Sequence, residues 1–537
     1  MTARHIYAVC LAIAWILPGL VGHDPWKPDE AYTFGVVYEL VTGGSRVVPH
    51  LAGEPYLDAP PLFHLTAAGM AWLLSPPLAL HDAARIATGL YMGLTLLFCG
   101  LAGRELHGRG SGTLAMMLLL GAFGLVIRSH QLITDVAALA GYAMVYLGCA
   151  LAMRTLWGSL WLGTGIGVVF MSQGVLATGI AAIIALALPL LHEAWRTRRY
   201  GFTVLLAVVA ASPWLGIWPM LLRAEAPAIF QAWLDQETSS RLFDTDELAF
   251  YAGILPWYGW PLWALATWAL WRAAQQQKLG AGMVLPLSGA LITFAALTFT
   301  ADKGELHALP LLLPLALLAT PAVASLRRGA SNGWYWFGIM GFTFFIAVAW
   351  FYWSALELGV PARLHAHLHR LQPGYTPGFR WLPFAVGAAY TIAWFAVLAR
   401  VKRAPERPAI VWAAGVTVVW ALLAVLFVGW LDTGKSYRSM VRSLEAALPR
   451  HYRCVASTGV AAPQRAMLDY FAGIETRRVE RDSGAAACEF MLVQGRPDVE
   501  DRPPGAWRRI WEGNRPGDKV ERYRLYQRIG DRRGGAR

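Results

Sequence analysis

Long apolar runs separated by short polar breaks fill most of the chain, up to about residue 431. A helix needs about 20 apolar residues to cross the hydrocarbon core of a bilayer. The pattern therefore predicts an α-helical polytopic membrane protein with about thirteen transmembrane helices. These spans lie near residues 5–22, 84–103, 112–127, 135–153, 156–171, 175–192, 200–221, 251–272, 281–299, 307–326, 333–354, 381–401 and 409–431.

One further apolar run, residues 60–80, decides the orientation of everything that follows it. If this run is a helix lying along the outer surface, the short basic loops all fall on the cytoplasmic side, as the positive-inside rule requires. Proline pairs at both ends and His64 within the run also suit an interfacial helix. The basic residues that then share a side with Arg4 are Arg104, Arg109, Arg154, Arg196, Arg198, Arg199, Arg272, Lys278, Arg327, Arg328, Arg400, Lys402 and Arg403.

This topology divides the chain into two domains. Residues 1–432 form the transmembrane domain, and residues 433–537 form a small α/β domain on the outer side. In this tail KSYRSMVRSLEAALP and PQRAMLDYFAG have helical patterns, whereas RCVAST and CEFMLVQG are typical of buried strands. The outward-facing segments are 23–83, 128–134, 222–250, 301–306, 355–380 and the tail.

Composition and charge agree with a membrane protein that has a basic tail. The 537 residues are 56% hydrophobic and 15% charged, and the formal net charge is +12. The tail from residue 433 onward holds 21 basic and 13 acidic residues, so it carries +8 of that charge. Because the tail follows many spans, we expect it to meet anionic lipid headgroups or phosphorylated glycolipids, and we expect no nucleic-acid partner.

The five cysteines indicate neither a zinc module nor a redox motif, because none is in a CxxC or Cys/His pattern. Cys10, Cys99 and Cys149 fall in apolar spans and are interpreted as core residues. Cys454 and Cys488 lie in the tail. A disulfide between them requires an oxidising compartment, and free thiols are the alternative.

The first outer segment, residues 23–83, is rich in carboxylates and is the candidate catalytic loop. Asp29 and Glu30 follow a proline and begin a helical pattern. Asp29 therefore occupies the place of a helix N-cap, and capping alone is the competing interpretation of this residue. The acids of the loop are Asp24, Asp29, Glu30, Glu39, Glu54 and Asp58.

The order DEAY, GGSRVVP and EPYLDAPPL after the first span resembles the outer loop of a known family. It is similar to bacterial GT-C glycosyltransferases related to the lipid A aminoarabinose transferase and to protein O-mannosyltransferases. The resemblance implies a GT-C fold with outer interfacial helices. It also implies transfer of a sugar from a polyprenyl-phosphate donor, such as undecaprenyl phosphate, to a lipid A, glycan or protein acceptor, on the periplasmic face of the inner membrane.

Three later segments resemble the same family in the same order: RSHQLITDVAALA, QETSSRLF and ADKGELHALP. Through the resemblance, the catalytic candidates are Asp29, Glu30 and Asp135. The competing roles are helix capping for Asp135, lipid-headgroup contact for Arg241 and Lys303, and structural roles for His64 and His307. The candidate substrate-binding residues are Tyr32, Glu54, Tyr56, Asp58, Arg128, Glu237, Arg241, Lys303 and His307.

Departures from the family pattern bear on metal binding. Asp58 and Ala59 stand where the lipid A branch has an acidic metal ligand and a phosphate-binding lysine, and Thr238 stands in place of a histidine ligand. We therefore name no metal ligand, and the cofactor stays unknown, with a divalent metal as the open alternative. The Thr-Lys-Gly turn of that branch is replaced by Ser172-Gln173-Gly174.

The predicted chemistry is an inverting displacement, in which an acceptor hydroxyl replaces the phosphate at the sugar. Such a step needs a proton acceptor and cations beside the leaving phosphate. We assign the first role to Asp29 and the second to Arg241 and Lys303. A transporter or flippase for a lipid-linked sugar is the alternative, but the acid-rich loop and the scarcity of charges within the spans argue against it.

Overall fold

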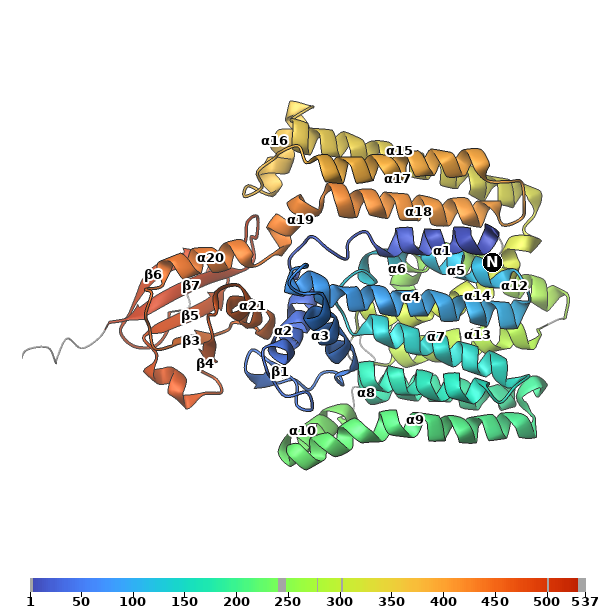
Figure 1. Cartoon of the computed structure of the whole chain (residues 1–537), viewed down its shortest axis with the longest axis horizontal. Coiled ribbons are helices and arrows are strands. Elements are labelled where there is room, and N and C mark those ends of the chain that lie inside the picture. Colours follow the sequence, from blue (N-terminus) through green and yellow to red (C-terminus); the bar gives the residue numbers. More distant parts are fainter. Residues whose placement is uncertain (1–2, 240–247, 278, 301–302, 500–501, 530–537) are drawn as a thin grey trace, which may run out of the picture.

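The computed structural model describes residues 3–239, 248–277, 279–300, 303–499 and 502–529. Helices lie side by side in a bundle, and a small sheet projects from one end of it (Figure 1). Within these ranges nine helices are long and apolar enough to cross a membrane, as expected for a multi-pass membrane protein. They are α4 (Leu80–His107), α7 (Asp135–Ala152), α8 (Gly158–Leu191), α9 (Arg198–Glu225), α13 (Ala281–Thr298), α14 with the turn before it (Leu306–Ser325), α15 (Arg328–Leu358), α17 (Trp381–Arg400) and α18 (Arg407–Leu426).

The predicted number of thirteen spans is not confirmed. Two predicted spans, 156–171 and 175–192, share the single element α8. Three others, 5–22, 112–127 and 251–272, fall on shorter helices. These are α1 (Ala3–Ile16), α5 (Ser111–Leu120), α6 (Phe123–Arg128), α11 (Phe250–Tyr258) and α12 (Leu262–Gln275).

The element α8 is a helical hairpin that reverses at Gly174, where the backbone is not helical. In the first arm Leu162 packs on Gly148, near the end of α7. In the second arm the carbonyl of Ala177 accepts a hydrogen bond from Tyr142, nearer the start of α7 (2.8 Å). Just after that arm, the indole of Trp195 donates to the carbonyl of Cys149, back at the end of α7. The two arms therefore run in opposite directions along α7.

The run 60–80 forms no long spanning helix. It contains α3 (Leu62–Leu74), a helix of 13 residues on which Trp72 is 78% exposed and Leu73 is 66% exposed. An apolar helix with such side chains on its surface suits the membrane interface. Other short helices are α2 (Asp29–Val41), α10 (Pro227–Thr238), α16 (Ala362–Leu371) and α19 (Val428–Lys435).

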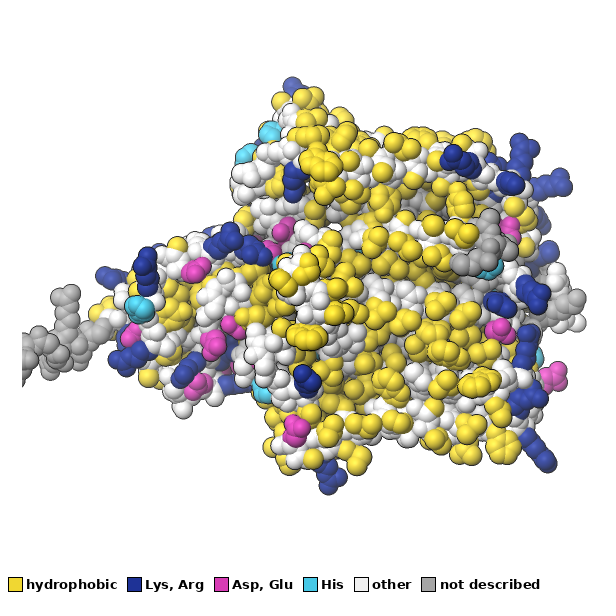
Figure 2. Space-filling view, in the orientation of Figure 1, with side chains coloured by type: hydrophobic (Ala, Val, Ile, Leu, Met, Phe, Trp, Pro, Cys, Tyr) yellow, Lys and Arg dark blue, Asp and Glu magenta, His cyan; other side chains and the backbone are white. Residues whose placement is uncertain are grey.

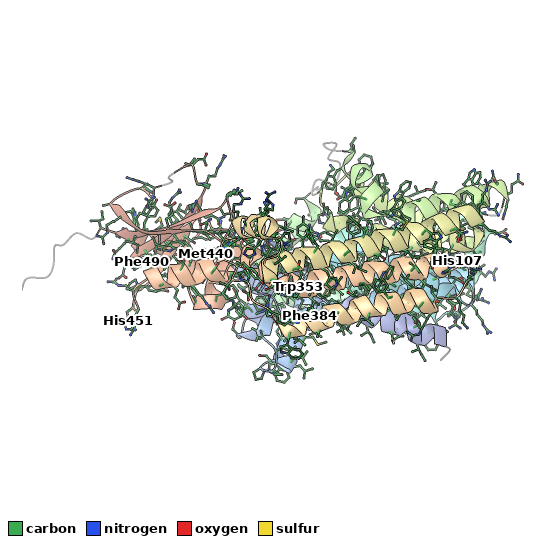
Figure 3. The ribbon with its side chains drawn as sticks, turned by 90° about the horizontal axis from the view of Figure 1, so that it is seen from above. His107, Trp353, Phe384, Met440, His451 and Phe490 are labelled. Atoms are coloured by element: carbon green, nitrogen blue, oxygen red, sulfur yellow. A yellow bond between two sulfur atoms is a disulfide. The ribbon has the colours of Figure 1, made fainter. Side chains whose placement is uncertain are left out.

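The two ends of the bundle differ in charge. Lysine and arginine side chains gather at the end opposite the sheet, while apolar side chains cover the sides of the bundle (Figure 2). Viewed from above, His107 of α4 marks that basic end, and Trp353 of α15 and Phe384 of α17 lie toward the sheet (Figure 3). A charged end and an apolar belt are what a membrane-embedded bundle requires.

The tail folds into a mixed sheet with the strand order β4-β3-β5-β7-β6. Strand β3 pairs in parallel with β4 and β5, whereas β7 pairs antiparallel with β5 and β6. The structure also joins Cys454 and Cys488 in a disulfide. The elements are α20 (Arg438–Ala447), β3 (Val455–Thr458), α21 (Ala462–Ala472), β4 (Thr476–Arg478), β5 (Phe490–Gly495), β6 (Trp507–Gly513) and β7 (Arg522–Arg528).

The first outer segment is packed between the bundle and the tail. Helix α2 lies so close to α21 that a side chain at Gly35 would meet Ala466 at 2.6 Å. Tyr470 of α21 packs its ring on Phe34, with centroids 4.7 Å apart, and its hydroxyl lies 2.8 Å from Nδ1 of His81. This segment also contains a small hairpin of β1 (His50–Leu51) and β2 (Glu54–Pro55). Its position is thus fixed from two sides.

Candidate active site

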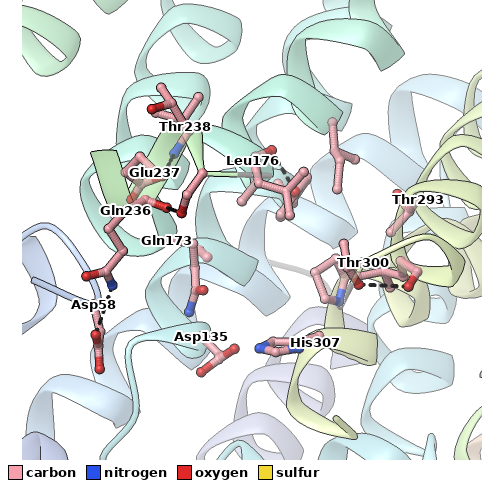
Figure 4. A pocket seen from close by; sticks show the side chains of 18 residues that line it. Asp58, Asp135, Gln173, Leu176, Gln236, Glu237, Thr238, Thr293, Thr300 and His307 are labelled. Carbon is pink, nitrogen blue, oxygen red and sulfur yellow. Dashed lines mark hydrogen bonds between the residues drawn. The ribbon is translucent and has the colours of Figure 1, made fainter. Parts of the chain in front are cut away.

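A cavity of about 460 Å³ opens where the helical bundle meets the outer segments (Figure 4). Its walls come from the start of α7, the tip of the α8 hairpin, α10, α13 and the segment before α14. It combines carboxylates and neutral hydrogen-bonding groups with an apolar side. The lining residues that carry polar side chains are Asp58, Asp135, Tyr142, Gln173, Gln236, Glu237, Thr238, Ser239, Thr293, Thr300 and His307.

Asp135 and His307 face each other across the inner part of the cavity (Figure 4). Asp135 is the first residue of α7, and the two side chains interact electrostatically. Gln173 approaches from the α8 hairpin and donates a hydrogen bond to the hydroxyl of Thr134 (3.0 Å). Both predicted residues, Asp135 and His307, therefore lie in the cavity.

Asp58 joins the first outer segment to α10 at the rim of the cavity. One carboxylate oxygen accepts a hydrogen bond from the hydroxyl of Tyr32. The other accepts one from the amide of Gln236 at 3.1 Å. Tyr56 is buried behind this pair, between the rings of Tyr32 and His64. Tyr32 and Asp58 are thus placed together, whereas Tyr56 supports them from within.

Glu237 of α10 fixes the tip of the α8 hairpin. Its carboxylate accepts a hydrogen bond from the backbone N–H of Val175 (2.9 Å), the first residue of the second arm. A side chain at Gly174 would place its Cβ 2.2 Å from that carboxylate, and the backbone φ there is +75°. Only glycine suits both conditions. Gly174 is therefore required for α10 to approach the hairpin.

Asp29 lies on α2 in a cluster with Arg128 and Glu305. Arg128 donates to Asp29 at 3.2 Å and to Glu305 at 3.4 Å. Burial raises the pKa of Asp29 above its usual value, the nearby charge of Glu30 adds to the rise, and Arg128 opposes both. Asp29 also interacts electrostatically with Asp135. Its side chain is 32% exposed, so it can still meet a substrate.

Two interpretations of the acidic pair change with the structure. Pro28 occupies the N-cap position of α2 and Asp29 is the first residue of the helix, so the N-cap interpretation of Asp29 is wrong. Glu30 points away from the cavity and is completely buried, where it accepts hydrogen bonds from Arg85 (2.9 Å) and from the N–H of Leu132 (3.0 Å). Burial alone would raise the pKa of Glu30, but the charge of Arg85 and these hydrogen bonds hold it below its usual value. Glu30 is a buried anchor.

Glu54 also lies away from the cavity, because it binds the tail. Its carboxylate contacts three arginines, Arg465 at 2.7 Å, Arg478 at 3.1 Å and Arg481 at 2.7 Å. Burial would raise the pKa of Glu54, but the hydrogen bond and charge of Arg465 and the charges of the other two arginines lower it. The structure therefore places this predicted substrate-binding residue in a contact between the first outer segment and the tail.

Of the two predicted phosphate-binding cations, only Lys303 lies within the described residues. Arg241 lies outside the described residues. Lys303 is half-buried on the segment that also carries Glu305 and His307. Sequence reasoning missed Glu305 and Gln236; the signal available for Glu305 was its place between Lys303 and His307 in ADKGELH.

The donor set does not form a metal centre of the kind that the lipid A branch implies. Thr238 offers only a hydroxyl at the position where that branch has a histidine ligand. In the ranges that the structure covers, no three His, Cys, Asp or Glu side chains are grouped to hold an ion. We therefore derive no chemical step through a metal.

Comparison of the sequence with known proteins gives several relatives with similar names. The chain is similar to undecaprenyl phosphate-alpha-4-amino-4-deoxy-L-arabinose arabinosyl transferase 1 of Sodalis glossinidius, with 30% identity over 335 residues, covering 58% of this chain and 57% of the relative. A protein of similar name from Pseudomonas aeruginosa LESB58 is 27% identical over 447 residues, covering 78% of this chain and 74% of that protein. The chain spans somewhat more than half the length of the first of these relatives. No family model matches the chain.

A solved structure resembles the whole chain. ArnT from Cupriavidus metallidurans bound to undecaprenyl phosphate superimposes with a TM-score of 0.69 and 14% identity, covering 97% of each chain. The apo form of that protein gives a TM-score of 0.66. The chain therefore has the ArnT-like GT-C fold, with a small C-terminal sheet domain. The resemblance predicted from the sequence is confirmed.

Proposed function

We propose that this chain is a glycosyltransferase that moves a sugar from undecaprenyl phosphate, or a related polyprenyl phosphate, to a lipid A, glycan or protein acceptor. The observation that carries this proposal is the meeting of Asp58, Asp135 and Glu237 at one cavity, with Asp29 close enough to Asp135 to interact with it electrostatically. These acids come from elements far apart in the sequence, and the cavity also has an apolar wall that suits an isoprenoid chain. The names of the similar proteins support the same donor.

The proposed reaction is a single displacement at the anomeric carbon. The acceptor oxygen forms a bond to that carbon while the bond from carbon to phosphate oxygen breaks, and polyprenyl phosphate leaves with the electron pair. Asp29 takes the proton of the acceptor hydroxyl, and its raised pKa makes it a better proton acceptor than an ordinary aspartate. Asp135 and Asp58 position the sugar.

Cations must offset the charge of the leaving phosphate. Arg128 lies beside Asp29, and Lys303 lies on the segment that carries Glu305 and His307. Arg241 follows α10 in the sequence and is the third proposed cation. An arginine can form two parallel hydrogen bonds to a phosphate, which suits this task.

We place the active site and the tail on the periplasmic face of the inner membrane. The basic residues at the opposite end of the bundle support this orientation, because cytoplasmic loops carry the excess of arginine and lysine. The disulfide between Cys454 and Cys488 supports it too, because such bonds persist in the periplasm and are rare in the cytosol.

The test measures the transfer of a radiolabelled sugar from a donor of known chemical structure. Membranes from a deletion strain supply the acceptors, and purified protein is added with undecaprenyl phosphate carrying radiolabelled aminoarabinose, arabinose, mannose or galacturonate. We expect one of these sugars to become covalently attached to an envelope lipid, glycan or protein. A protein that only relocates the intact labelled donor across vesicles would be a flippase, and the proposal would be wrong.

Asp29→Asn tests the catalytic assignment in the same assay. The amide cannot accept the proton, so we expect transfer to fall by at least a hundredfold. The control is Asp498→Asn, because Asp498 is 66% exposed in the tail and should leave transfer unchanged. Near-normal transfer by a correctly inserted Asp29→Asn protein would remove Asp29 from this role.

A further inference from the structure

The connection between α15 and α17, residues 359–380, has an unusual charge for its position. It lies at the sheet end of the bundle, where a side chain at Gly374 would touch Pro516 of the tail at 3.1 Å (Figure 1). It contains three arginines and three histidines, but no aspartate or glutamate. The positive-inside rule makes such a concentration unusual at the outer end of spanning helices. We therefore expect these cations to have an anionic binding partner.

Helix α16 arranges part of this charge on one face. Leu364 and Leu368 pack toward the bundle in an apolar cluster with Leu356 and Phe427. Arg363, His367 and Arg370 follow spacings of four and three residues, which place them along one side of a helix. All three are exposed. We call these three residues the α16 stripe.

Large apolar side chains around α16 show the depth at which it lies. Val360 is 65% exposed, Phe379 is 56% exposed and Trp381 is 71% exposed. Trp381 begins the spanning helix α17 at the end that Phe384 marks in Figure 3. Aromatic residues at the ends of spanning helices sit at the level of the lipid headgroups. The α16 stripe is therefore next to the phosphate layer.

Nothing within the described protein neutralises the two arginines of the stripe. Neither Arg363 nor Arg370 has a carboxylate within ion-pair distance among the described residues. The acid nearest in sequence, Glu357, is instead engaged by Tyr375 and by the N–H of Gly378. Two exposed guanidinium groups thus face the headgroup layer with all their donors available.

We propose that the α16 stripe binds the phosphate groups of anionic phospholipids in the outer leaflet. Arg363 and Arg370 supply the charge, and the exposed apolar residues around them hold the helix at the right depth. The inference depends on the membrane position of α16 and not on the transferase activity. It assigns to this connection a binding surface separate from the cavity.

The test uses the purified full chain in nanodiscs that contain phosphatidylcholine with a minor fraction of a headgroup-photoreactive phosphatidylglycerol. After illumination, mass spectrometry quantifies lipid attached to peptides that cover residues 359–380. We expect attachment to exceed that of a photoreactive phosphatidylcholine and to fall with added salt. Arg363→Gln combined with Arg370→Gln should reduce it roughly thirtyfold, since each arginine near an anionic surface contributes about 1 kcal/mol.

The matched control is Arg453→Gln combined with Arg496→Gln. Both of these arginines are exposed in the tail, at 85% and 78%, so the control removes the same charge away from the apolar belt. It should leave labelling of residues 359–380 unchanged. Equal labelling by the two photoreactive lipids, or unchanged labelling in the α16 variant, would overturn the proposal. An unchanged thermal transition shows that the variants are folded.

Discussion

We expect the contact between Glu54 and the tail to hold the first outer segment in place. Replacing Glu54 by glutamine removes the charge that three arginines share, while the side chain keeps its size. Arg465 is only 4% exposed and Glu54 is 23% exposed, so solvent can replace little of the lost interaction. We expect the hairpin of β1 and β2 to open more readily in this variant.

The size of the effect follows from the contacts. The hydrogen bond from Arg465 to Glu54 is 2.7 Å long and charge-assisted, and the same guanidinium also donates to the carbonyl of Ala52 in the hairpin. A hydrogen bond to a charged group contributes about 1.5–3 kcal/mol. Glutamine retains part of it, so we take about 2 kcal/mol, which corresponds to a roughly thirtyfold increase in opening.

Hydrogen–deuterium exchange of a peptide covering residues 50–58 measures this opening directly. The amide of Tyr56 bonds to the carbonyl of Pro49, and the amide of Gly53 bonds to Glu39, so both report on the hairpin. Glu489→Gln is the control, because its partner Arg453 is 85% exposed and such a pair contributes about 0–1 kcal/mol. Exchange within threefold of the unaltered protein would refute the idea that Glu54 secures the hairpin.

Three further substitutions test other features. Glu30→Gln removes one of the two charged partners of the buried Arg85 and leaves Asp82 as the other, so the protein should lose about 1.5–3 kcal/mol of stability, seen as a lower yield of folded protein. Burial and the charge of Asp24 raise the pKa of Asp432 to about 6, above its value in the unfolded chain. Stability of the folded protein is therefore lost as the pH rises through about 6. Asp432→Asn should raise the unfolding temperature at pH 8 more than at pH 5. Cys454→Ser should destabilise the tail by about 2–4 kcal/mol, measured by thermal unfolding with and without reductant.

Much of the fold follows from patterns that are local in the sequence. The hairpin at α8 was predicted as two spans, because Gln173 and Gly174 interrupt two apolar runs that are each long enough to cross a bilayer. Charge in the short loops predicted that the run 60–80 is not a spanning helix, and the structure gives it only the 13-residue helix α3. The helices α20 and α21 and the strands β3 and β5 were also predicted from their periodicity.

The missed strands show where this reasoning was incomplete. The segments 507–513 and 522–528 were not predicted as strands, but they form the paired strands β6 and β7. In β7 the apolar residues Tyr523 and Leu525 are buried, and so is Arg524 between them. A buried arginine obscures the pattern of a strand when only the sequence is available.

Some residues of the site could be predicted from the sequence and the partners of others could not, for a physical reason. Resemblance to the family led to Asp135, His307, Glu237 and Asp58, and all four line the cavity. The partners of Glu30 and Glu54 could not be predicted, because Arg85 and Arg465 are distant in the sequence and only the tertiary fold brings them close. Whether an acid of the first outer segment has a structural or a catalytic role depends on such partners.

The position of the first outer segment between bundle and tail also sets the order in which the molecule can be completed. Arg465 lies 411 residues after Glu54, and Arg438 lies 414 residues after Asp24, which it binds through a 2.8 Å hydrogen bond. At about 5–20 residues per second, a ribosome needs roughly 20 to 80 seconds to make the intervening chain. During that interval the emerging loop lacks the arginine partners of these acids, so a nascent chain truncated before the tail would leave the first outer segment without its contacts on the tail side.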